Sequence, residues 1–372
     1  LTARACAVKG LDVLAAIGTD VALMHLHGIS QKLKFKGLQT KAQEKIAQIA
    51  EARELTTEEL ADRLVPDLDL DENGTMVLDF GPRQFTVGFD EHLTPFVLED
   101  GARKKDLPKP AKADDAEKAK AAVEAYKALK KDVRAIASHQ LTRLEQLMCS
   151  ERRVTKDVFQ KFFVEHPLVV HLVRRLVWGA YVDGKLSCAF RIDDERRATS
   201  ADDEPIELTD AMEIGLLHPL AMTDAIKARF GELLADYEIL QPFEQLGRAT
   251  YAASPEELKS KKLSRFEGKS APLGAVRGLE GQGWLRGAPQ DAGIVWDVLK
   301  PVPGHPDLEV AVNLDPGFSA AGYNDFADTA TQKLTAPIVR KKGSWKDAEG
   351  LEALGAIQLS ELIRDLTLIT SA

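Results

Sequence analysis

The residues that could do chemistry gather in one irregular stretch, ADYEILQPFEQLGRATY, which spans residues 235–251. Tyr237, Glu238, Gln241 and Arg248 carry hydrogen-bonding side chains there at spacings that follow neither a helical nor a strand period. An arginine can clamp an anionic group, and a buried glutamate can act as a general base. These four residues are therefore binding candidates and, alternatively, the acid/base set of an enzyme. The opposite interpretation is a well-satisfied turn that locks neighbouring elements together through backbone hydrogen bonds.

A second candidate is a row of cations on a long predicted helix. Lys127, Lys130, Lys131 and Arg134 are separated by the intervals i, i+3, i+4 and i+7, which places them on one side of a helix. Such a row is a candidate binding surface for an acidic partner.

Charge is distributed unevenly around that row. Residues 103–161 contain 16 Lys and Arg against nine Asp and Glu, a net charge of +7, whereas residues 193–213 contain two against nine, a net charge of −7. The two regions either complement each other or are merely solvated. The sharper alternative is a basic groove for an acidic partner.

No nucleotide-binding or hydrolase motif is present in the sequence. The glycine-rich stretch GLEGQGWLRG lacks the pattern of a phosphate loop and follows a helix rather than a strand. The G-x-S-x-G pattern of a nucleophile elbow is absent. Cys149 and His139 are ten residues apart, about 15 Å along one helix, so they could not meet there as nucleophile and base.

The histidines and carboxylates form no recognisable metal motif. His166 and His171 are five residues apart, whereas zinc-binding helices place two histidines four apart on one face. The acids Asp193–Asp194 and those of residues 202–204 lie in a polar stretch without apolar neighbours that would raise a pKa. They are interpreted as solvated loop charges, with a cation site as the lesser alternative. No metal and no cofactor is predicted.

Length and composition are those of a globular protein with a sizeable core. The chain has 372 residues, of which 44% are hydrophobic, and it is long enough for two or three domains. No apolar run approaches the roughly 18 residues that a spanning helix needs. Three cysteines without a C-x-x-C pair favour a reducing compartment, so the cytoplasm is the expected location. The start, LTARACAVKG, has neither Met nor a signal-peptide pattern and reads like a piece of a longer chain.

Changes of hydrophobic period divide the chain into four regions. Residues 1–66 read as paired amphipathic helices, typical of the end of a helical-repeat (HEAT-like) array. Residues 67–101 contain short strands separated by turns, which predict a small antiparallel β-meander. Residues 102–176 begin with a Pro- and Lys-rich linker and continue as helices, and residues 177–372 mix β-hairpins with helices. Strands that come as hairpins rather than βαβ units indicate an α+β fold.

Local signals identify individual elements. Asp183–Gly184 fits a type I′ turn between VWGAYV and KLSCAFRI, the clearest hairpin in the chain. Thr56 and Ser254 begin capping boxes, so a helix is expected after each. Other expected features are helix caps at Thr19–Asp20, Asp114, Thr223 and Ser360, strands at EPIEL, YEIL, GIVWDVL and LEVAVNL, and apolar stripes at Leu23, Leu26, Ile29 and Leu33 and at Leu38, Ala42, Ile46 and Ile49.

Several longer segments resemble a known bacterial family. LADRLVPDLDLDENGTMVLDFGPRQFTVGFDE, followed by LPKP, resembles the opening of a bacterial C-terminal domain of unknown function. HPLVVHLVRRLVWGAY, HPLAM and LLADYEILQPFEQLGR resemble its later landmarks, and DYEILQPFEQLGR is the most specific. That domain occurs in proteins labelled molybdate metabolism regulators (MolR-like proteins), which carry an N-terminal WGR domain and helical repeats. The resemblance covers roughly residues 10–372.

The resemblance implies membership of a multiprotein system rather than a particular chemistry. It transfers no catalytic residue to a numbered position, and Trp178-Gly179-Ala180 belongs to the predicted hairpin rather than to a WGR domain. Related proteins are encoded near AAA+ ATPases and proteins with von Willebrand factor A domains, which implies such partners by association alone. No oxyanion-binding motif in the sequence supports molybdate binding.

Together these observations favour a non-enzymatic interaction, scaffold or regulatory module of a larger bacterial protein, with protein partners. Contacts would use residues 236–251 and the cations between Lys127 and Arg134. One alternative is a nucleic-acid-binding module, which the cations favour and the net charge of −9 opposes. The other is an unrecognised enzyme with a site near residues 236–251.

Overall fold

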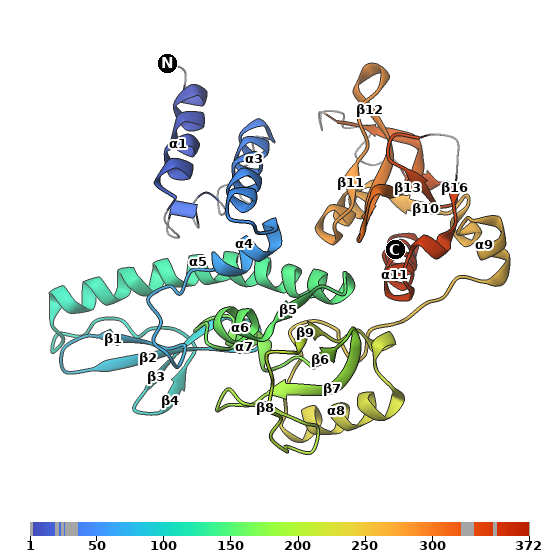
Figure 1. The fold of residues 1–372 in the computed structure, drawn as a ribbon. Coiled ribbons are helices and arrows are strands. Elements are labelled where there is room, and N and C mark those ends of the chain that lie inside the picture. The colour runs from blue at the N-terminus through green and yellow to red at the C-terminus, as the bar shows by residue number, and fades with distance from the viewer. Residues whose placement is uncertain are drawn as a thin grey trace. The chain divides into compact units, whose positions relative to one another are not determined.

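The computed structural model describes residues 3–18, 22, 23, 26, 36–320, 331–344 and 348–371. Two compact units make up the chain: unit 1 comprises residues 1–138, 156–174 and 194–196, and unit 2 comprises residues 139–155, 175–193 and 197–372. Helices and antiparallel sheets occur in both units, so the predicted α+β class is confirmed (Figure 1). Among the helices so described, none is long and apolar enough to cross a membrane.

Unit 1 begins with the helices α1 (Ala3–Ile17), α3 (Lys36–Ala52) and α4 (Thr57–Arg63). Their common core includes the predicted stripe positions Leu23, Leu26, Ala42 and Ile46, with Ile49 packed against it. The expected cap at Thr19–Asp20, the stripe positions Ile29 and Leu33, and the Leu38 side chain lie outside the described residues. The capping box at Thr56 is confirmed, because the Glu59 N–H donates to the Thr56 hydroxyl and the Thr56 N–H donates to the Glu59 carboxylate.

A four-stranded antiparallel meander follows, with the strand order β1 (Met76–Asp79), β2 (Gln84–Phe89), β3 (Pro95–Glu99) and β4 (Ala102–Lys104). The sequence predicted the first three strands and assigned residues 103–104 to a linker. They pair with β3 instead, because Asp100 (φ 50°) and Gly101 (φ 79°) form a tight turn of left-handed residues.

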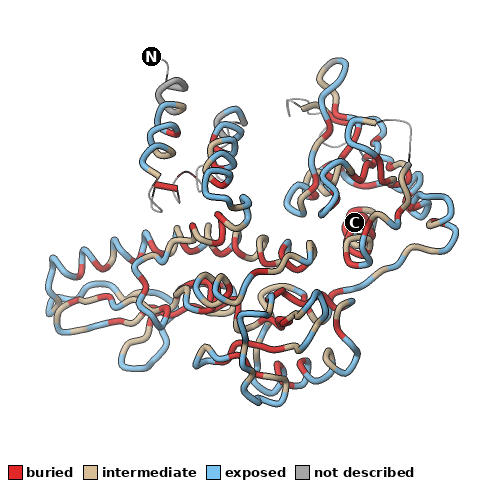
Figure 2. The backbone as a smooth tube through the Cα atoms, in the orientation of Figure 1, coloured by how far each residue is buried: buried red, intermediate tan, exposed pale blue. Residues whose placement is uncertain are grey.

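The long helix α5 (Ala116–Cys149) covers this sheet with an apolar face that includes Ala122, Tyr126, Leu129 and Val133. Buried and exposed positions alternate along it, as the period of 3.6 residues requires (Figure 2). Its residues up to 138 belong to unit 1 and the rest to unit 2.

The start of α5 differs from the predicted cap by one residue. The Asp115 carboxylate accepts hydrogen bonds from the N–H groups of Glu117 and Lys118, both at 3.0 Å. Asp114, the expected cap, instead receives two hydrogen bonds from the Arg83 guanidinium, at 3.0 and 2.6 Å. That partner is 31 residues away in the chain, so only the tertiary structure assigns the two aspartates their roles.

Short helical turns complete unit 1. Helix α6 (Lys156–Phe159) runs into a π-helical turn at Gln160–Val164, and α7 is limited to Val170–Val173. Residues 102–176 were expected to continue as helices after the linker, but α7 is limited to little more than one turn within residues 166–176. Phe159 and Phe163 are buried, as the apolar pattern around them predicts.

The first sheet of unit 2 has the strand order β5-β9-β6-β7-β8, with bounds β5 (Arg153–Thr155), β6 (Trp178–Val182), β7 (Lys185–Ile192), β8 (Ala198–Thr199) and β9 (Glu213–Leu216). The predicted β6–β7 hairpin is confirmed, with Asp183 at φ 49° and Gly184 at φ 76°. The expected strand EPIEL is wrong, because only Pro205 makes an isolated bridge, to Thr199. Helix α8 (Asp224–Asp236) is capped by Thr223, as predicted.

The second sheet of unit 2 is built around two long strands, β12 (Ile294–Val302) and β13 (His305–Ser319), which form the predicted hairpin. Strand β13 pairs with β15 over residues 308–311 and with β14 over residues 314–315. The shorter strands are β10 (Ser270–Pro272), β11 (Leu285–Arg286), β14 (Thr331–Leu334), β15 (Ile338–Lys341) and β16 (Ala348–Glu349).

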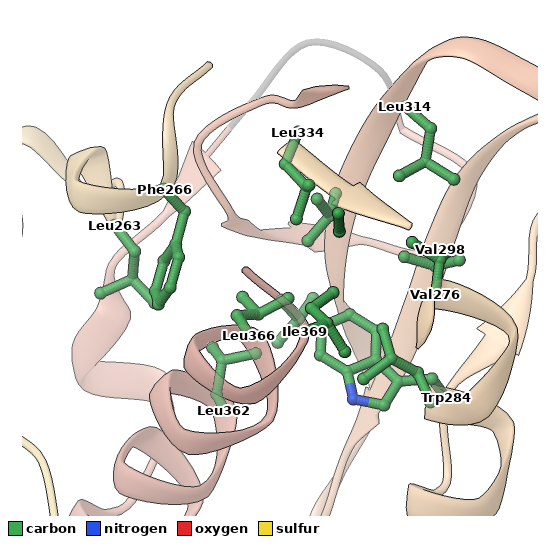
Figure 3. Close-up of a cluster of buried hydrophobic side chains, with 14 of the residues drawn as sticks. Leu263, Phe266, Val276, Trp284, Val298, Leu314, Leu334, Leu362, Leu366 and Ile369 are labelled. Atoms are coloured by element: carbon green, nitrogen blue, oxygen red, sulfur yellow. The ribbon is translucent and has the colours of Figure 1, made fainter. Parts of the chain in front are cut away.

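The helices α9 (Pro255–Ser260), α10 (Leu273–Gly278) and α11 (Ala356–Thr370) accompany this sheet. The capping box at Ser254 is confirmed. Figure 3 shows Leu362, Leu366 and Ile369 of α11 in one buried cluster with Trp284 and residues of the sheet. The expected cap at Ser360 is wrong: α11 starts four residues earlier, and the buried Ser360 hydroxyl accepts a hydrogen bond from the Tyr251 N–H at 2.9 Å.

Candidate functional site

Residues 236–251, here called the polar segment, begin by ending α8. The N–H of Glu238 bonds to the carbonyl of Ala235 at 3.1 Å, and that of Ile239 bonds to the carbonyl of Leu234 at 2.8 Å. This pair of bonds is a Schellman closure, in which Glu238 (φ 53°) occupies the left-handed position that usually holds glycine. The expected strand at YEIL is therefore wrong, because the helix end takes the backbone groups that strand pairing would need.

The first two candidate side chains point to solvent. Tyr237 is 55% exposed, and its hydroxyl donates to the carboxylate of Asp203 at 2.9 Å. The Arg191 guanidinium lies 4.9 Å from the centre of its ring. Glu238 is exposed as well. The contacts described for Tyr237 and Glu238 do not bring either side chain to Arg248.

Gln241 and Gln245 connect the polar segment to the first sheet of unit 2. The fully buried Gln245 amide accepts from the Val177 N–H at 2.9 Å and donates to the carbonyls of Val177 and Leu217, both at 2.8 Å. Gln241 donates to the Gln245 carbonyl oxygen at 2.8 Å and accepts from the Leu246 N–H at 2.9 Å. Two side-chain amides thus satisfy backbone groups where β6 begins and β9 ends.

Arg248 is the centre of a buried ion network. Its side chain is 3% exposed and bonds both oxygens of the Glu361 carboxylate, at 2.8 and 2.5 Å. The same guanidinium donates to Glu145 of α5 at 2.7 Å and to the carbonyl of Glu244 at 3.4 Å. Arg248 therefore joins the end of α5, the polar segment and α11. We call Arg248, Glu361, Glu145, His218 and Cys149 the buried junction.

His218 and Cys149 complete the coordination of Glu361. The Nδ1 atom of His218 accepts from the Leu220 N–H at 3.2 Å, so its Nε2 carries the proton that is donated to Glu361 at 3.1 Å. The Cys149 thiol lies 3.3 Å from the other carboxylate oxygen. Each oxygen of Glu361 thus has at least two partners, which is what a buried carboxylate needs.

Electrostatics in the buried junction favours fixed charges. Burial alone would raise the pKa of Glu361, but the hydrogen bonds from Arg248 and His218 outweigh burial and hold that pKa well below its usual range. Burial next to Glu361 raises the pKa of the Cys149 thiol. A thiol that stays protonated is a poor nucleophile. The buried junction is therefore suited to holding elements together.

A small pocket lies beside the buried junction. His218, Met148, Arg152, Tyr181 and Ile357 are among its lining residues. The pocket has a cavity volume of about 10 Å³, which is room for a single water molecule. The pocket is thus too small for an organic substrate in this conformation.

Other buried charges of unit 2 are paired in the same manner. Arg340 bonds Glu309 at 2.9 Å and Asp297 at 3.1 Å. Asp365 accepts from the indole N–H of Trp284 at 2.9 Å and from Lys300 at 2.5 Å. These contacts tie the strands of the second sheet to one another and to α11.

The cations predicted on α5 do not all behave alike. Lys130 bonds Asp106 at 3.0 Å, and its ammonium lies 4.7 Å from the centre of the Tyr126 ring. Lys127, Lys131 and Arg134 are exposed and have no ion-pair partner in the described part of the chain. We call these three residues the basic face.

The acidic region at residues 193–213 is paired with arginines. The ion pairs of its members are Asp193 with Arg197, Asp194 with Arg174, Asp202 with Arg229, Asp203 with Arg191, and Glu213 with Arg153. Much of its negative charge is therefore compensated nearby.

Among the residues that the structure describes, no group of three His, Cys, Asp or Glu side chains is arranged to hold a metal ion. The two closely spaced histidines bond backbone groups: His166 lies 3.0 Å from the carbonyl of Val65, and His171 lies 3.3 Å from that of Gly74.

Sequence reasoning missed most of the buried junction. Glu361 lies 113 residues from Arg248, and Glu145 lies 103 residues from it. The available signal was the position of Glu361 within the apolar face of the last helix, where an acid must have a partner. Its partner could not be chosen from 49 Lys and Arg residues without the fold.

Comparison with known proteins finds a domain family of unknown function and an uncharacterized relative. Residues 101–284 match a family model described as "Domain of unknown function (DUF4132)". Over 285 residues the chain is 43% identical to "Uncharacterized protein YehI" of Escherichia coli (strain K12), in an alignment that covers 76% of this chain and 24% of that protein. The chain thus spans about a quarter of the length of this relative. No solved structure matches the chain.

Proposed function

We propose that the chain is a non-enzymatic interaction module of a larger protein and that a protein partner binds the basic face. The observation that carries the proposal is that Lys127, Lys131 and Arg134 stand exposed on a 34-residue helix without ion-pair partners among the described residues. A long helix packed on a sheet holds such charges in a fixed row. Unpaired charges in a fixed row accelerate and orient the approach of an oppositely charged partner.

In this proposal the polar segment has an internal role. Gln241, Gln245 and Arg248 bond groups of unit 2, and Tyr237 bonds Asp203. An enzymatic site in this segment has less support, because the four candidate side chains do not converge on one opening. The segment instead supports the module by keeping the end of α5, α11 and the first sheet of unit 2 together.

The wider setting follows the sequence resemblance. We place the chain with the MolR-like, WGR-associated proteins, in the cytoplasm, with α1 and α3 as the end of a HEAT-like array. The partners that this setting favours are AAA+ ATPases or proteins with von Willebrand factor A domains, by association alone. The length of the relative supports a larger parent protein, since the alignment covers 24% of it.

Affinity capture with charge-reversed variants tests the proposal. The variant Lys127→Glu/Lys131→Glu/Arg134→Glu should lose a protein that the unchanged chain captures from native lysate. All three positions are exposed on one helix, so the fold should persist and circular dichroism should be unchanged. Capture that survives the triple reversal would contradict the proposal.

A matched control reverses three exposed lysines of unit 2, at Lys259, Lys333 and Lys341. This variant has the same net charge as the first one, so a nonspecific effect of charge would appear in both. Capture should be retained by the control and lost only when the basic face is reversed.

Nucleic-acid binding is the second candidate, and the same unpaired cations favour it. Three phosphate contacts would give a slope of about −3 for the logarithm of affinity against that of salt. Titration with a DNA duplex and an RNA strand checks this, and failure to retain either at low ionic strength would remove the candidate.

A further inference from the structure

The exposed side of α5 carries an ordered charge pattern that is longer than the basic face. Lys120 and Glu124 precede Lys127, Lys131 and Arg134, and all five side chains are exposed. No ion pair involving Lys120 or Glu124 occurs among the described residues either. We call these five residues the charged stripe. Its charge order along the helix is plus, minus, plus, plus, plus.

The geometry of α5 makes the charged stripe straight. Its members are separated by four, three, four and three residues, so they fall within an arc of about 80° on a helix of 3.6 residues per turn. The stripe is about 21 Å long at a rise of 1.5 Å per residue. The buried residues Tyr126, Leu129 and Val133 lie on the opposite side of the helix and hold it to the β1–β4 sheet.

The surroundings of the charged stripe favour a helix as its partner. Ala121 and Ala128 lie next to one side of it and are exposed, so the backbone of a second helix can approach closely there. Side chains spaced by three and four residues on one helix match those on another. Opposite charges at such positions set the choice and register of paired helices.

The same surroundings disfavour nucleic acid. Glu124 interrupts the row and would face a phosphate of any backbone that tracked it. The only Phe, Tyr or Trp of α5 is Tyr126, which is buried, so the stripe offers bases no exposed ring of this kind to stack on. A polypeptide can meet Glu124 with a cation, whereas a nucleic-acid strand cannot.

We infer that the charged stripe binds an acidic amphipathic helix of complementary charge order. That helix would place Asp or Glu opposite Lys120, Lys127, Lys131 and Arg134, and Lys or Arg opposite Glu124. This inference rests on the proposed function and specifies the chemistry of the partner.

Three synthetic helical peptides of equal composition provide the test. Each carries four Glu and one Lys at the five stripe-facing positions, with the Lys second, fourth or third. A Lys at the second position lies opposite Glu124 in a parallel complex, and a Lys at the fourth position lies opposite Glu124 in an antiparallel complex. A Lys at the third position lies opposite Lys127 in both orientations. One of the first two should bind about three- to tenfold tighter than the third at low ionic strength, because two exposed charge pairs change sign.

A charge swap adds a control within the same chain. The variant Glu124→Lys should bind the preferred peptide about three- to tenfold more weakly and should regain affinity when the peptide Lys is replaced by Glu. Circular dichroism of the variant should be unchanged, since Glu124 is exposed.

Three results would overturn the inference: equal affinity for the three peptides, no measurable binding of any of them, or tighter binding of a DNA duplex than of the preferred peptide. If the peptides are bound equally but reversal of the basic face still abolishes capture, the inference fails and the proposed function stands. If capture survives that reversal, the proposed function itself fails.

Discussion

Replacement of Arg248 by methionine should destabilise unit 2 strongly, because the buried Glu361 carboxylate would lose its counter-ion. The Arg248 and Glu361 side chains are 3% and 5% exposed, so water cannot take the place of the missing guanidinium. Two hydrogen bonds to Glu361 and one to Glu145 disappear together. Removal of one partner of a buried ion pair costs about 3–5 kcal/mol, and this geometry belongs in that range.

Removal of both charges should cost much less. In Arg248→Met/Glu361→Leu neither side chain leaves a buried charge behind, and apolar replacements of buried ion pairs are often close to neutral. His218 and Cys149 lose an acceptor in this variant, so a loss of about 1–2 kcal/mol is expected instead of full recovery.

The contribution of Glu361 to the free energy of unfolding should depend on pH with opposite signs in the unchanged chain and in Arg248→Met. In the unchanged chain the folded pKa of Glu361 is lower than the ordinary value of 4.5, so its contribution is complete above that pH and is lost only as the pH falls below it. In Arg248→Met we expect burial to outweigh the remaining hydrogen bonds and to raise the folded pKa of Glu361 above the ordinary value. The variant should therefore lose further stability as the pH rises above the ordinary value of 4.5.

Urea unfolding followed by tryptophan fluorescence measures these differences, because Trp178 and Trp284 are both buried in unit 2. Arg364→Met is a matched control: its contact with the exposed Glu244 is 3.4 Å long, and its loss should cost less than about 1 kcal/mol. A cost of Arg248→Met as small as that of the control would refute the reasoning. So would a double variant no more stable than the single one.

Two further variants test the polar segment, each by urea unfolding. Glu238→Gly should stabilise the chain by about 0.5–1 kcal/mol, because Glu238 has a left-handed backbone (φ 53°) that costs a non-glycine residue energy; destabilisation would mean that the Glu238 side chain makes a favourable contact. Gln245→Ala should cost about 2–4 kcal/mol, since it leaves the Val177 N–H and the Leu217 carbonyl without the amide that they bond, whereas the Val177 carbonyl keeps the Leu217 N–H at 3.2 Å. A cost under about 1 kcal/mol would show that water replaces the amide.

Elements with short-range signals could be predicted from the sequence. The Asp183–Gly184 hairpin and the caps at Thr56, Thr223 and Ser254 are all confirmed. Each depends on residues within a few positions of one another, so each can be predicted from a short stretch of sequence. The α+β class could be predicted as well, because the strands of the chain come as hairpins rather than as βαβ units.

Elements decided by distant partners could not be predicted in this way. Asp114 and Asp115 are equally good caps in sequence, and the guanidinium of Arg83 decides between them. Ser360 has the composition of a cap but lies inside α11, where it accepts a hydrogen bond from Tyr251. The residues of YEIL are compatible with a strand, yet the closure of α8 takes up their backbone.

The candidate site illustrates the same division. The residues rich in hydrogen-bonding groups and the row of cations on one helix face could be identified along the chain, because both follow from composition and helical period. The inward turn of Arg248 to Glu361 and the exposure of the Lys127 charge depend instead on how distant elements pack. A buried charge requires a partner at hydrogen-bond distance, and folding alone brings residues 113 positions apart to that distance.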